Sequence, residues 1–305
     1  MRVLIIANCT NRKRATRVPP AYVRALSPGP VAVVAAAWID TLSQDVNLRP
    51  LPAVYCGRGF SEVLGAVKIL KATLLVVSAG LGLVAADTAI PSYGATVSGP
   101  SEDNVLGKLE DGDPTSWWLK ICELSPFSTP LATESYDLVL VALSRPYFPL
   151  LAPALEGLNA IERAKIRLFL SASASELHEP LRDYLMPYGS RFDNEAGPLR
   201  GTKSDFTQRA LRHFVNTIVE SDTQHESALL HRIRIDSELG ALTIPVHPVR
   251  RRLDDCQIAN LIRHHWHDVR GSSSRMLRYL RHTLGIACEQ KRFQGIFNQI
   301  REATK

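Results

Sequence analysis

The sequence lacks the features that mark several large classes of protein. Its 305 residues contain no uninterrupted apolar run of about 18 residues, the length that a membrane-spanning helix requires. Its five cysteines are scattered and form no CxxC pair, so neither a zinc site nor a disulfide framework is indicated. The apolar stretch at the start of the chain is too short for a secretory signal. We therefore expect a cytoplasmic protein that does not associate with membranes.

Motifs of familiar catalytic and nucleotide-binding sites are also missing. The sequence has no GxGxxG or P-loop pattern and no GxSxG nucleophile elbow. Seven of the nine histidines follow residue 224, so the body of the chain has only His178 and His213, which are far apart. We therefore expect no metal ion and no cofactor.

The net charge of +6 is concentrated in the last quarter of the chain. Residues His225 to Lys305 contain 14 Lys and Arg against 8 Asp and Glu, whereas the preceding part is balanced. A neutral body followed by a basic tail suggests a polyanionic partner, most simply nucleic acid. A basic helical domain without such a partner is the alternative. We divide the chain into residues 1–222 and a basic, mostly helical domain of residues 223–305.

Short apolar runs alternate with helical stretches in the first domain. The runs 2–7, 74–77, 137–143 and 166–170 have the length of buried strands. The alternation predicts an α/β fold with a mainly parallel central sheet and helices on both faces. Ligands of such sheets bind beyond the carboxyl ends of the strands. We expect the small polar residues that follow the four runs to converge at this edge: Asn8, Ser78, Ser144 and Ser171.

The polar residues around the second run suit chemistry at the bond between a sugar and a base. We expect residues 74–104 to form a strand and a long pocket-forming loop, although an ordinary connecting loop is the alternative. Cleavage of a sugar–base bond develops positive charge on the sugar, which a carboxylate can stabilise. Asp87 is the candidate carboxylate, unless it only binds backbone amides. Tyr93 is the candidate for stacking on the base.

The end of the first run supplies the second candidate catalytic group. The amide of Asn8 offers both a donor and an acceptor, so it could hold the water or the base. Gly80 and Gly82, with Gly94 and Ala95, would leave room for a bulky base. The expected base pocket consists of Cys9, Thr10, Ser78, Gly80, Gly82, Tyr93, Thr96 and Ser171.

Two groups of cations in the first domain are candidate contacts to DNA phosphates. Arg12 and Lys13 follow the first run, and a solvated charge run is the alternative. Arg200 and Lys203 precede a helix that we expect Ser204 to cap, and helix N-termini favour anions. A capping loop without a ligand is the alternative for this second group.

The sequence of the basic tail predicts three helices, at residues 254–267, 273–283 and 288–301. A tight turn at residues 284–286 would make the last two a helix-turn-helix. The candidate DNA contacts are Arg275 and Arg278, which precede the turn, and Lys291 and Arg292, which follow it.

A resemblance to a known family rests on two segments and several single positions. They are Asn8-Cys9-Thr10-Asn11-Arg12-Lys13 and Ser78-Ala79-Gly80-Leu81-Gly82-Leu83, with Asp87, Ile90-Pro91-Ser92-Tyr93 and Thr96. This pattern resembles the uracil-DNA-glycosylase-like α/β domains of archaeosine and queuosine transglycosylase relatives and of bacterial defence loci. The resemblance covers residues 1–212 and extends to anti-phage DNA glycosylases that excise glucosylated hydroxymethylcytosine. It implies that Asn8 occupies the place of the family's Asp or Asn. The GQDPYH and HPSPLS-type motifs of ordinary uracil-DNA glycosylases are absent, so the water-activating group stays open between Asn8 and Asp87.

These observations together predict a DNA glycosylase that leaves abasic sites in double-stranded DNA with modified bases, without an obligatory protein partner. The resemblance implies a role in defence against phages. No lysine stands out in the stretch 74–104, where Lys71 and Lys108 only flank the predicted pocket, so we expect a monofunctional enzyme. One alternative is an enzyme that exchanges bases in tRNA or transfers deoxyribose between nucleosides. The other is a non-enzymatic DNA-binding regulator whose α/β domain senses a nucleotide.

Overall fold

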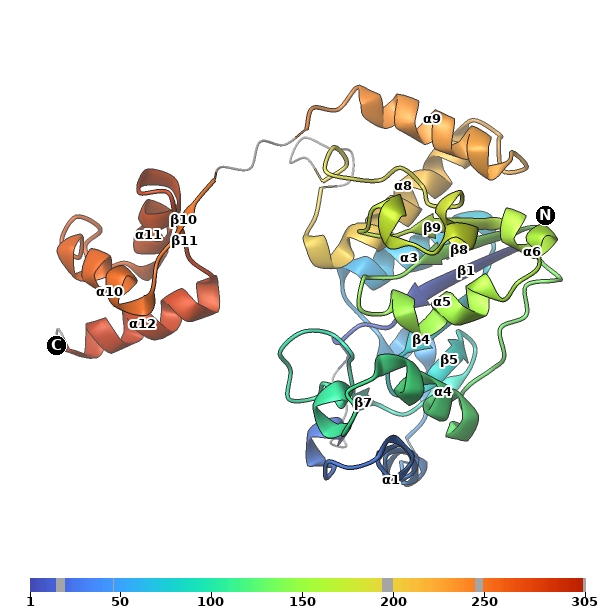
Figure 1. The fold of residues 1–305 in the computed structure, drawn as a ribbon, viewed down its shortest axis with the longest axis horizontal. Coiled ribbons are helices and arrows are strands. Elements are labelled where there is room, and N and C mark those ends of the chain that lie inside the picture. The colour runs from blue at the N-terminus through green and yellow to red at the C-terminus, as the bar shows by residue number, and fades with distance from the viewer. Residues whose placement is uncertain (15–19, 46, 194–199, 245–248, 304–305) are drawn as a thin grey trace. The chain divides into compact units, whose positions relative to one another are not determined.

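The protein consists of two compact units, Met1–Pro245 and Val246–Lys305. The computed structural model, drawn in Figure 1, describes residues 1–14, 20–45, 47–193, 200–244 and 249–303. We expected the boundary after residue 222, whereas the two compact units divide after residue 245. Helix α9 (Ala228–Gly240) belongs to the first unit, because its Ile235 and Leu239 are buried in that unit's core.

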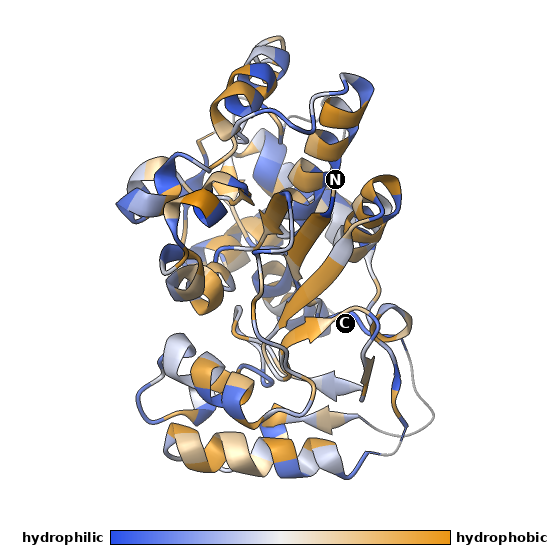
Figure 2. Cartoon of the chain, turned by 90° about the vertical axis from the view of Figure 1, so that its right-hand side faces the viewer, coloured by the Kyte–Doolittle hydropathy of each residue, from blue (hydrophilic) through white to orange (hydrophobic). Residues whose placement is uncertain are grey.

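A five-stranded sheet forms the centre of the first unit, in the order β5-β4-β1-β8-β9. The apolar runs become strands because each is buried along nearly its whole length, and Figure 2 shows this part of the cartoon in the hydrophobic colour. β1 pairs in parallel with both β4 and β8, and β8 pairs in parallel with β9. The strands are β1 (Val3–Asn8), β4 (Thr73–Ser78), β5 (Gly82–Ala85), β8 (Leu138–Ala142) and β9 (Ile166–Phe169). The expected mainly parallel α/β sheet is thus confirmed.

The strand order creates a topological switch point beside β1. From β1 the chain moves to β4 on one side, and it later returns to β8 and β9 on the other side. The loops that follow β1 and β8 therefore lead in opposite directions, which opens a crevice at the carboxyl ends of these strands. A ligand site is expected there on topological grounds alone.

Helices cover the sheet in two groups. α3 and α8 pack together against β1, β8 and β9, whereas α4 packs against α1, α5 and β5 (Figure 1). No helix within the described ranges is both long and apolar enough to cross a membrane. The helices of the first unit, apart from α9, are α1 (Val31–Ser43), α2 (Leu51–Val54), α3 (Arg58–Leu70), α4 (Pro114–Leu124), α5 (Phe148–Glu156), α6 (Ala160–Ala164), α7 (Glu179–Arg182) and α8 (Phe206–Glu220).

The segment after β4 does not form the long loop that we expected from its polar residues. It turns at residues 79–81 and returns as β5, antiparallel to β4. Two indole groups fix this turn, because Trp38 Nε1 donates to Gly80 O and Trp117 Nε1 donates to Ala79 O, each at 2.7 Å. Beyond β5 the chain forms two short pairs, β3 (Arg49–Pro50) with β6 (Ala89–Ile90), and β2 (Ala21–Tyr22) with β7 (Tyr93–Gly94).

The second unit has a small hydrophobic core of its own, which includes Ile258, Met276, Phe293 and Phe297. The three expected helices form, although a strand pair, β10 (Arg251–Arg252) with β11 (Ile286–Ala287), was not expected. Because β11 lies between the second and third helices, their connection is longer than the tight turn of the predicted helix-turn-helix. The helices are α10 (Asp255–His264), α11 (Ser273–Arg278), which continues as a π-helix at Tyr279–Thr283, and α12 (Gln290–Ala303).

A buried arginine joins the sheet to the segment before α9. Arg167 on β9 donates from Nε to His231 Nδ1 at 2.8 Å and from Nη2 to the carbonyl of Glu226 at 2.7 Å. Burial lowers the pKa of Arg167 to about 10, so its guanidinium stays protonated at neutral pH. His231 Nδ1 must therefore accept, and Nε2 carries the proton that is shared with Thr223 O at 2.8 Å.

This arrangement predicts acid sensitivity of the first unit. Burial, and then the cation of Arg167, lower the pKa of His231, so the folded state favours the neutral ring. The stabilisation is present above the unfolded pKa of about 6.5 and is lost as the pH falls below it. Urea unfolding followed by tryptophan fluorescence should show lower stability at about pH 5.5 than at about pH 7.5.

The matched variant is His231→Gln, whose amide can accept from Arg167 and donate to Thr223 without titrating. It should lose less stability over the same pH interval than the wild type. Equal losses in the two proteins would exclude His231 as the source of the acid sensitivity.

Candidate functional site

A pocket lies at the switch point, and we call it the switch-point pocket. Its volume is about 770 Å³. It is formed by the loops after β1, β8 and β9, by the start of α3, and by the approach to α8. The lining residues are Asn8, Cys9, Thr10, Asn11, Arg12, Gly57, Arg58, Gly59, Phe60, Thr96, Ser98, Ser144, Arg145, Pro146, Tyr147, Ser171, Thr202, Lys203, Ser204, Asp205, Thr207 and Gln208.

Three of the four polar strand ends meet in this pocket, as the sequence predicted. Asn8, Ser144 and Ser171 line it, together with Cys9 and Thr10. Ser78 does not, because its hydroxyl is buried and accepts from the backbone N–H groups of Gly80 and Leu81 at 3.3 and 3.1 Å. Ser78 therefore holds the turn after β4 rather than a ligand.

Asn8 has a fixed orientation with a saturated acceptor. Its Oδ1 accepts from Ser144 N at 2.9 Å and from Gln208 Nε2 at 3.0 Å, while its Nδ2 donates to Cys9 O at 2.8 Å. An amide oxygen has two lone pairs, so this oxygen has no capacity left to accept from a water molecule. Asn8 can still donate through its second N–H, which suits contact with a ligand better than activation of water.

The start of α8 brings a carboxylate into the pocket. Asp205 is buried, and its Oδ1 accepts from Thr202 N at 2.8 Å and from Arg209 Nε at 2.7 Å. Its other oxygen, Oδ2, lies 3.8 Å from Arg58 Nε, which is beyond hydrogen-bond distance. Oδ2 is thus the oxygen of this carboxylate that remains able to accept from a ligand or a water molecule.

Two buried polar atoms of α8 have no partner among the residues that the structure describes. They are Thr207 Oγ1 and Gln208 Oε1, on side chains that line the switch-point pocket and are 3% and 4% exposed. An unpaired buried polar group costs about 1–3 kcal/mol. A ligand with polar groups would satisfy both atoms, so their position indicates a binding site.

Cations surround the same pocket. Arg12, Arg58, Arg145 and Lys203 line it, and the side chains of Arg58 and Arg145 are 51% and 73% exposed. Arg200, predicted to join them, does not line the pocket, and its carbonyl instead accepts from Arg58.

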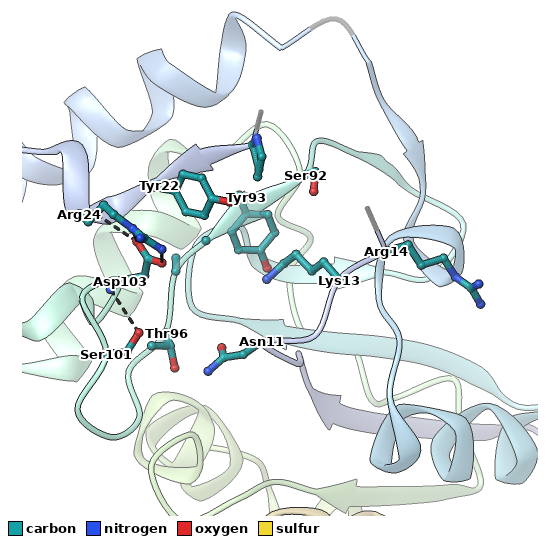
Figure 3. A pocket seen from close by; sticks show the side chains of 13 residues that line it. Asn11, Lys13, Arg14, Tyr22, Arg24, Ser92, Tyr93, Thr96, Ser101 and Asp103 are labelled. Carbon is teal, nitrogen blue, oxygen red and sulfur yellow. Dashed lines mark hydrogen bonds and ion pairs between the residues drawn. The ribbon is translucent and has the colours of Figure 1, made fainter. Parts of the chain in front are cut away.

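A second pocket of about 460 Å³, shown in Figure 3, adjoins the first and shares Asn11 and Thr96 with it. We call it the tyrosine pocket. Its Asp103 is engaged by Arg24, which donates from Nη2 at 2.6 Å and from Nε at 2.9 Å. Its lining residues are Asn11, Lys13, Arg14, Pro20, Tyr22, Arg24, Ser92, Tyr93, Gly94, Ala95, Thr96, Ser101 and Asp103.

Tyr93 forms a wall of this pocket and is not a free stacking surface. It is only 1% exposed, its hydroxyl lies 2.5 Å from those of Tyr55 and Ser78, and Lys13 Nζ lies over its ring at 4.3 Å. Burial raises the pKa of Tyr93 well above its ordinary value. The structure thus does not present Tyr93 as the exposed stacking surface that we expected, because its ring is buried and Lys13 Nζ lies over one face.

Asp87 lies at the opposite end of the sheet from the pocket. It follows β5, whose last residue pairs with Leu75 near the beginning of β4. The carboxyl ends of β1 and β8 are at the other edge, and Asp87 lines neither pocket. The prediction that Asp87 and Asn8 form one site is wrong, because the chain reverses after β4.

The glycines of the turn after β4 allow close packing and do not enlarge a pocket. A Cβ atom at Gly80 would lie 3.0 Å from Ala95 and from Tyr93. A Cβ at Gly82 would lie 2.5 Å from Ser128 Oγ, and its φ of +83° suits glycine. Gly80 and Gly82, which we expected in the base pocket, therefore line neither pocket, whereas Gly94 and Ala95 line the tyrosine pocket.

The candidate DNA contacts of the second unit differ in whether their side chains are exposed or bonded to other residues of the unit. The side chains of Arg275, Arg278 and Lys291 are exposed. Arg292 lies 2.6 Å from Asp255 and donates to Leu253 O at 2.9 Å, which ties α12 to the start of α10. Arg292 therefore has a structural role.

Sequence reasoning missed Asp205, Thr207 and Gln208. The sequence signal that could have found Asp205 is its spacing from Thr202 and Arg209, which fits a capping box followed by an i,i+4 ion pair. Nothing in the sequence shows that Gln208 reaches Asn8, which lies 200 residues earlier.

Comparisons with known proteins found no match. No family model, no curated protein and no solved structure matches the chain. Within the described ranges, no three His, Cys, Asp or Glu side chains are grouped so that they could hold a metal ion. The site must be interpreted from its own geometry.

The hydrogen bonds of Asn8 predict a stability cost for its removal. Asn8→Ala leaves the N–H of Ser144 and the amide of Gln208 without their acceptor, so we expect a loss of about 1–3 kcal/mol in urea unfolding. The matched control is Asn11→Ala, which removes an exposed amide and should change the stability by no more than about 0.5 kcal/mol. Equal effects of the two substitutions would contradict the structural role of Asn8.

Proposed function

We propose that the first unit is a DNA glycosylase that hydrolyses the N-glycosidic bond of a modified base and leaves an abasic site. The observation that carries this proposal is the pair of adjoining pockets. One has a cationic rim and unpaired buried polar atoms, and the other has tyrosine walls. A nucleotide extruded from duplex DNA needs cations for its phosphates and polar groups for its base, which the switch-point pocket offers, and the adjoining tyrosine pocket provides further room.

The cationic rim supports binding of a phosphodiester backbone. Asp205 is the one acidic residue of the switch-point pocket, and its ion pair with Arg209 neutralises it, whereas four cations surround the opening. Arginine is well suited to phosphate because its donors form a planar fork. Arg12, Arg58, Arg145 and Lys203 would hold the DNA strand on either side of the extruded nucleotide.

The amides inside the pocket support recognition of a polar edge. Gln208 Oε1 can accept a hydrogen bond, and Asn8 Nδ2 can donate its second N–H. The two amides are joined by the hydrogen bond from Gln208 Nε2 to Asn8 Oδ1, so their free groups are held in a fixed relation. A cytosine ring carries an amino donor beside a ring acceptor, which matches such a pair.

The reaction requires a group that stabilises charge at the sugar, and Asp205 replaces Asp87 in this role. As the bond between C1′ and the base breaks, the base leaves with the electron pair and C1′ becomes electron-poor. A water molecule adds to C1′ and transfers a proton to Asp205 Oδ2. Arg209 holds the other carboxylate oxygen and keeps the group oriented.

The identity of the base is proposed from the resemblance described above together with the pocket sizes. Volumes of about 460 and 770 Å³ lie in the range of roughly 300–1,000 Å³ that is typical of small-molecule sites. Together they would accommodate a base as bulky as glucosylated hydroxymethylcytosine. From the same resemblance we propose that the first unit has a uracil-DNA-glycosylase-like fold and that the protein acts in defence against phages.

The second unit would supply general affinity for duplex DNA. Residues 246–305 contain 12 Lys and Arg against 5 Asp and Glu. Contacts between such side chains and phosphates are independent of sequence and weaken as the salt concentration rises.

An abasic-site assay tests the proposed reaction. Purified protein should create aldehyde-reactive sites in phage DNA that contains glucosylated hydroxymethylcytosine, and not in unmodified DNA. Asp205→Asn keeps the shape of the side chain and removes its charge, so the rate should fall by about a hundredfold or more. Asp87→Asn is the matched control and should retain full activity. Circular dichroism checks that both variants are folded.

The same assay separates the alternatives. Binding to DNA without abasic sites would favour a non-enzymatic regulator. Base release from tRNA or free nucleosides, without action on DNA, would favour the base-exchange enzyme. Equal activity in Asp205→Asn and the wild type would exclude the assigned role of Asp205.

The contribution of the second unit is tested by the salt dependence of binding. Arg275 and Arg278 lie on one face of α11, three residues apart. The double variant Arg275→Ala/Arg278→Ala should bind duplex DNA more weakly, and the slope of log K against log salt should fall by about 0.9 for each phosphate that the variant no longer neutralises. Lys68→Ala/Lys120→Ala removes the same charge from the first unit and should leave the slope unchanged.

A further inference from the structure

Backbone hydrogen bonds fix the segment that carries Lys13, and this places its side chain in the lining of the tyrosine pocket. Lys13 forms an antiparallel bridge with Tyr55. On either side of the bridge, Arg14 N donates to Val54 O at 2.9 Å and Cys56 N donates to Arg12 O at 3.0 Å. The side chain extends from this bridge along the Tyr93 ring, and its amine lies on the side of Asn11 (Figure 3).

The surroundings of this amine are aromatic. Lys13 Nζ lies 4.3 Å from the centre of the Tyr93 ring and 5.6 Å from that of Tyr55, and its hydrogen-bond acceptor is Thr10 O at 3.3 Å. Among the residues that the structure describes, no carboxylate forms an ion pair with it, and the nearby Asp103 is engaged by Arg24. A lysine that serves only to attract phosphate would extend into solvent, whereas this one lies over the Tyr93 ring and near that of Tyr55.

Burial favours the neutral form of this amine. Burial lowers the pKa of Lys13, and the neighbouring Cys9, Asp103 and Cys56 only partly oppose this effect. A neutral amine has a free electron pair and can attack a carbonyl carbon, as lysines in desolvated pockets do when they form Schiff bases.

We propose that Lys13 is a nucleophile that forms an imine with the aldehyde carbon C1′ of an abasic deoxyribose, so that the protein also cleaves the DNA strand at abasic sites. This inference rests on the proposed function in one respect, since it requires that abasic DNA reaches the tyrosine pocket. It replaces the expectation of a monofunctional enzyme. That expectation considered the lysines near residues 74–104, whereas the structure brings Lys13, from the segment after β1, to the ring of Tyr93.

The proposed steps need no oxidant or reductant. The Nζ–C1′ bond forms, and the aldehyde oxygen leaves as water with the two amine protons. The imine then acidifies C2′, from which a proton passes to water. The electrons of the C2′–H bond form a double bond between C2′ and C3′, and the bond between C3′ and its oxygen breaks, which releases the 3′ phosphate group. Hydrolysis of the imine regenerates Lys13.

Borohydride trapping on a preformed abasic site tests this proposal separately from base removal. Duplex DNA that contains one uracil is first treated with an unrelated uracil-DNA glycosylase, so the protein itself need not release any base. With sodium borohydride, the wild-type protein should become covalently attached to the DNA, and peptide mapping should locate the attachment at Lys13. Without borohydride, the strand should be cut at the abasic site.

Lys13→Arg and Lys13→Gln should abolish both the trapped complex and strand cutting, while Lys120→Arg, on α4, should behave as the wild type. A wild-type protein that traps no DNA, or an adduct mapped to another lysine, would overturn the proposal whether or not the variants fold. Trapping at Lys13 without release of modified bases would refute the glycosylase and leave this inference standing. Release of modified bases without trapping would support the glycosylase and overturn the proposed role of Lys13.

Discussion

The side-chain oxygen of Asn8 is the interaction on which the site depends. It accepts one hydrogen bond from the loop after β8 and one from α8, so three segments that are far apart in the sequence meet at one atom. β1 ends at this residue, in the centre of the sheet, where buried backbone groups must all be paired. The side chain of Asn8, the last residue of β1, thus continues the pairing of this strand, and it fixes Gln208, whose buried Oε1 has no partner among the described residues.

The sequence predicted the parts of the fold that depend on local apolar pattern. The four buried strands were found because each is a continuous apolar run, and their polar ends met in a pocket because parallel strands share a carboxyl edge. Asp87 was misplaced because the reversal into β5 depends on the tertiary contacts of Trp38 and Trp117 with the turn after β4. The polar loop pattern contains no sign of these contacts.

The site residues that the sequence did not reveal come from outside the expected pocket stretch. Asp205 and Gln208 reach the pocket because α8 packs against α3, β8 and β9, and this packing joins residues about 200 positions apart. Lys13 was considered only as a phosphate contact, because its burial depends on the backbone bridge with Tyr55. A cation in a sequence carries no mark of whether it will be solvated or buried, although these two fates give opposite chemistry.

Under the proposed function, the distribution of charge would separate general attraction to DNA from selection of the base. The first unit is nearly neutral, with 24 Lys and Arg against 25 Asp and Glu, so its cationic rim acts only at short range. In this proposal the strongly basic second unit would hold any duplex, and covalent linkage would make the subsequent capture of one nucleotide an intramolecular event. Selectivity would then rest on the pocket, where an incorrect base would leave Gln208 Oε1 and Thr207 Oγ1 unpaired, as they are without a ligand. Because unpaired buried groups cost more than paired ones contribute, such a pocket would reject incorrect bases more strongly than it would attract the correct one.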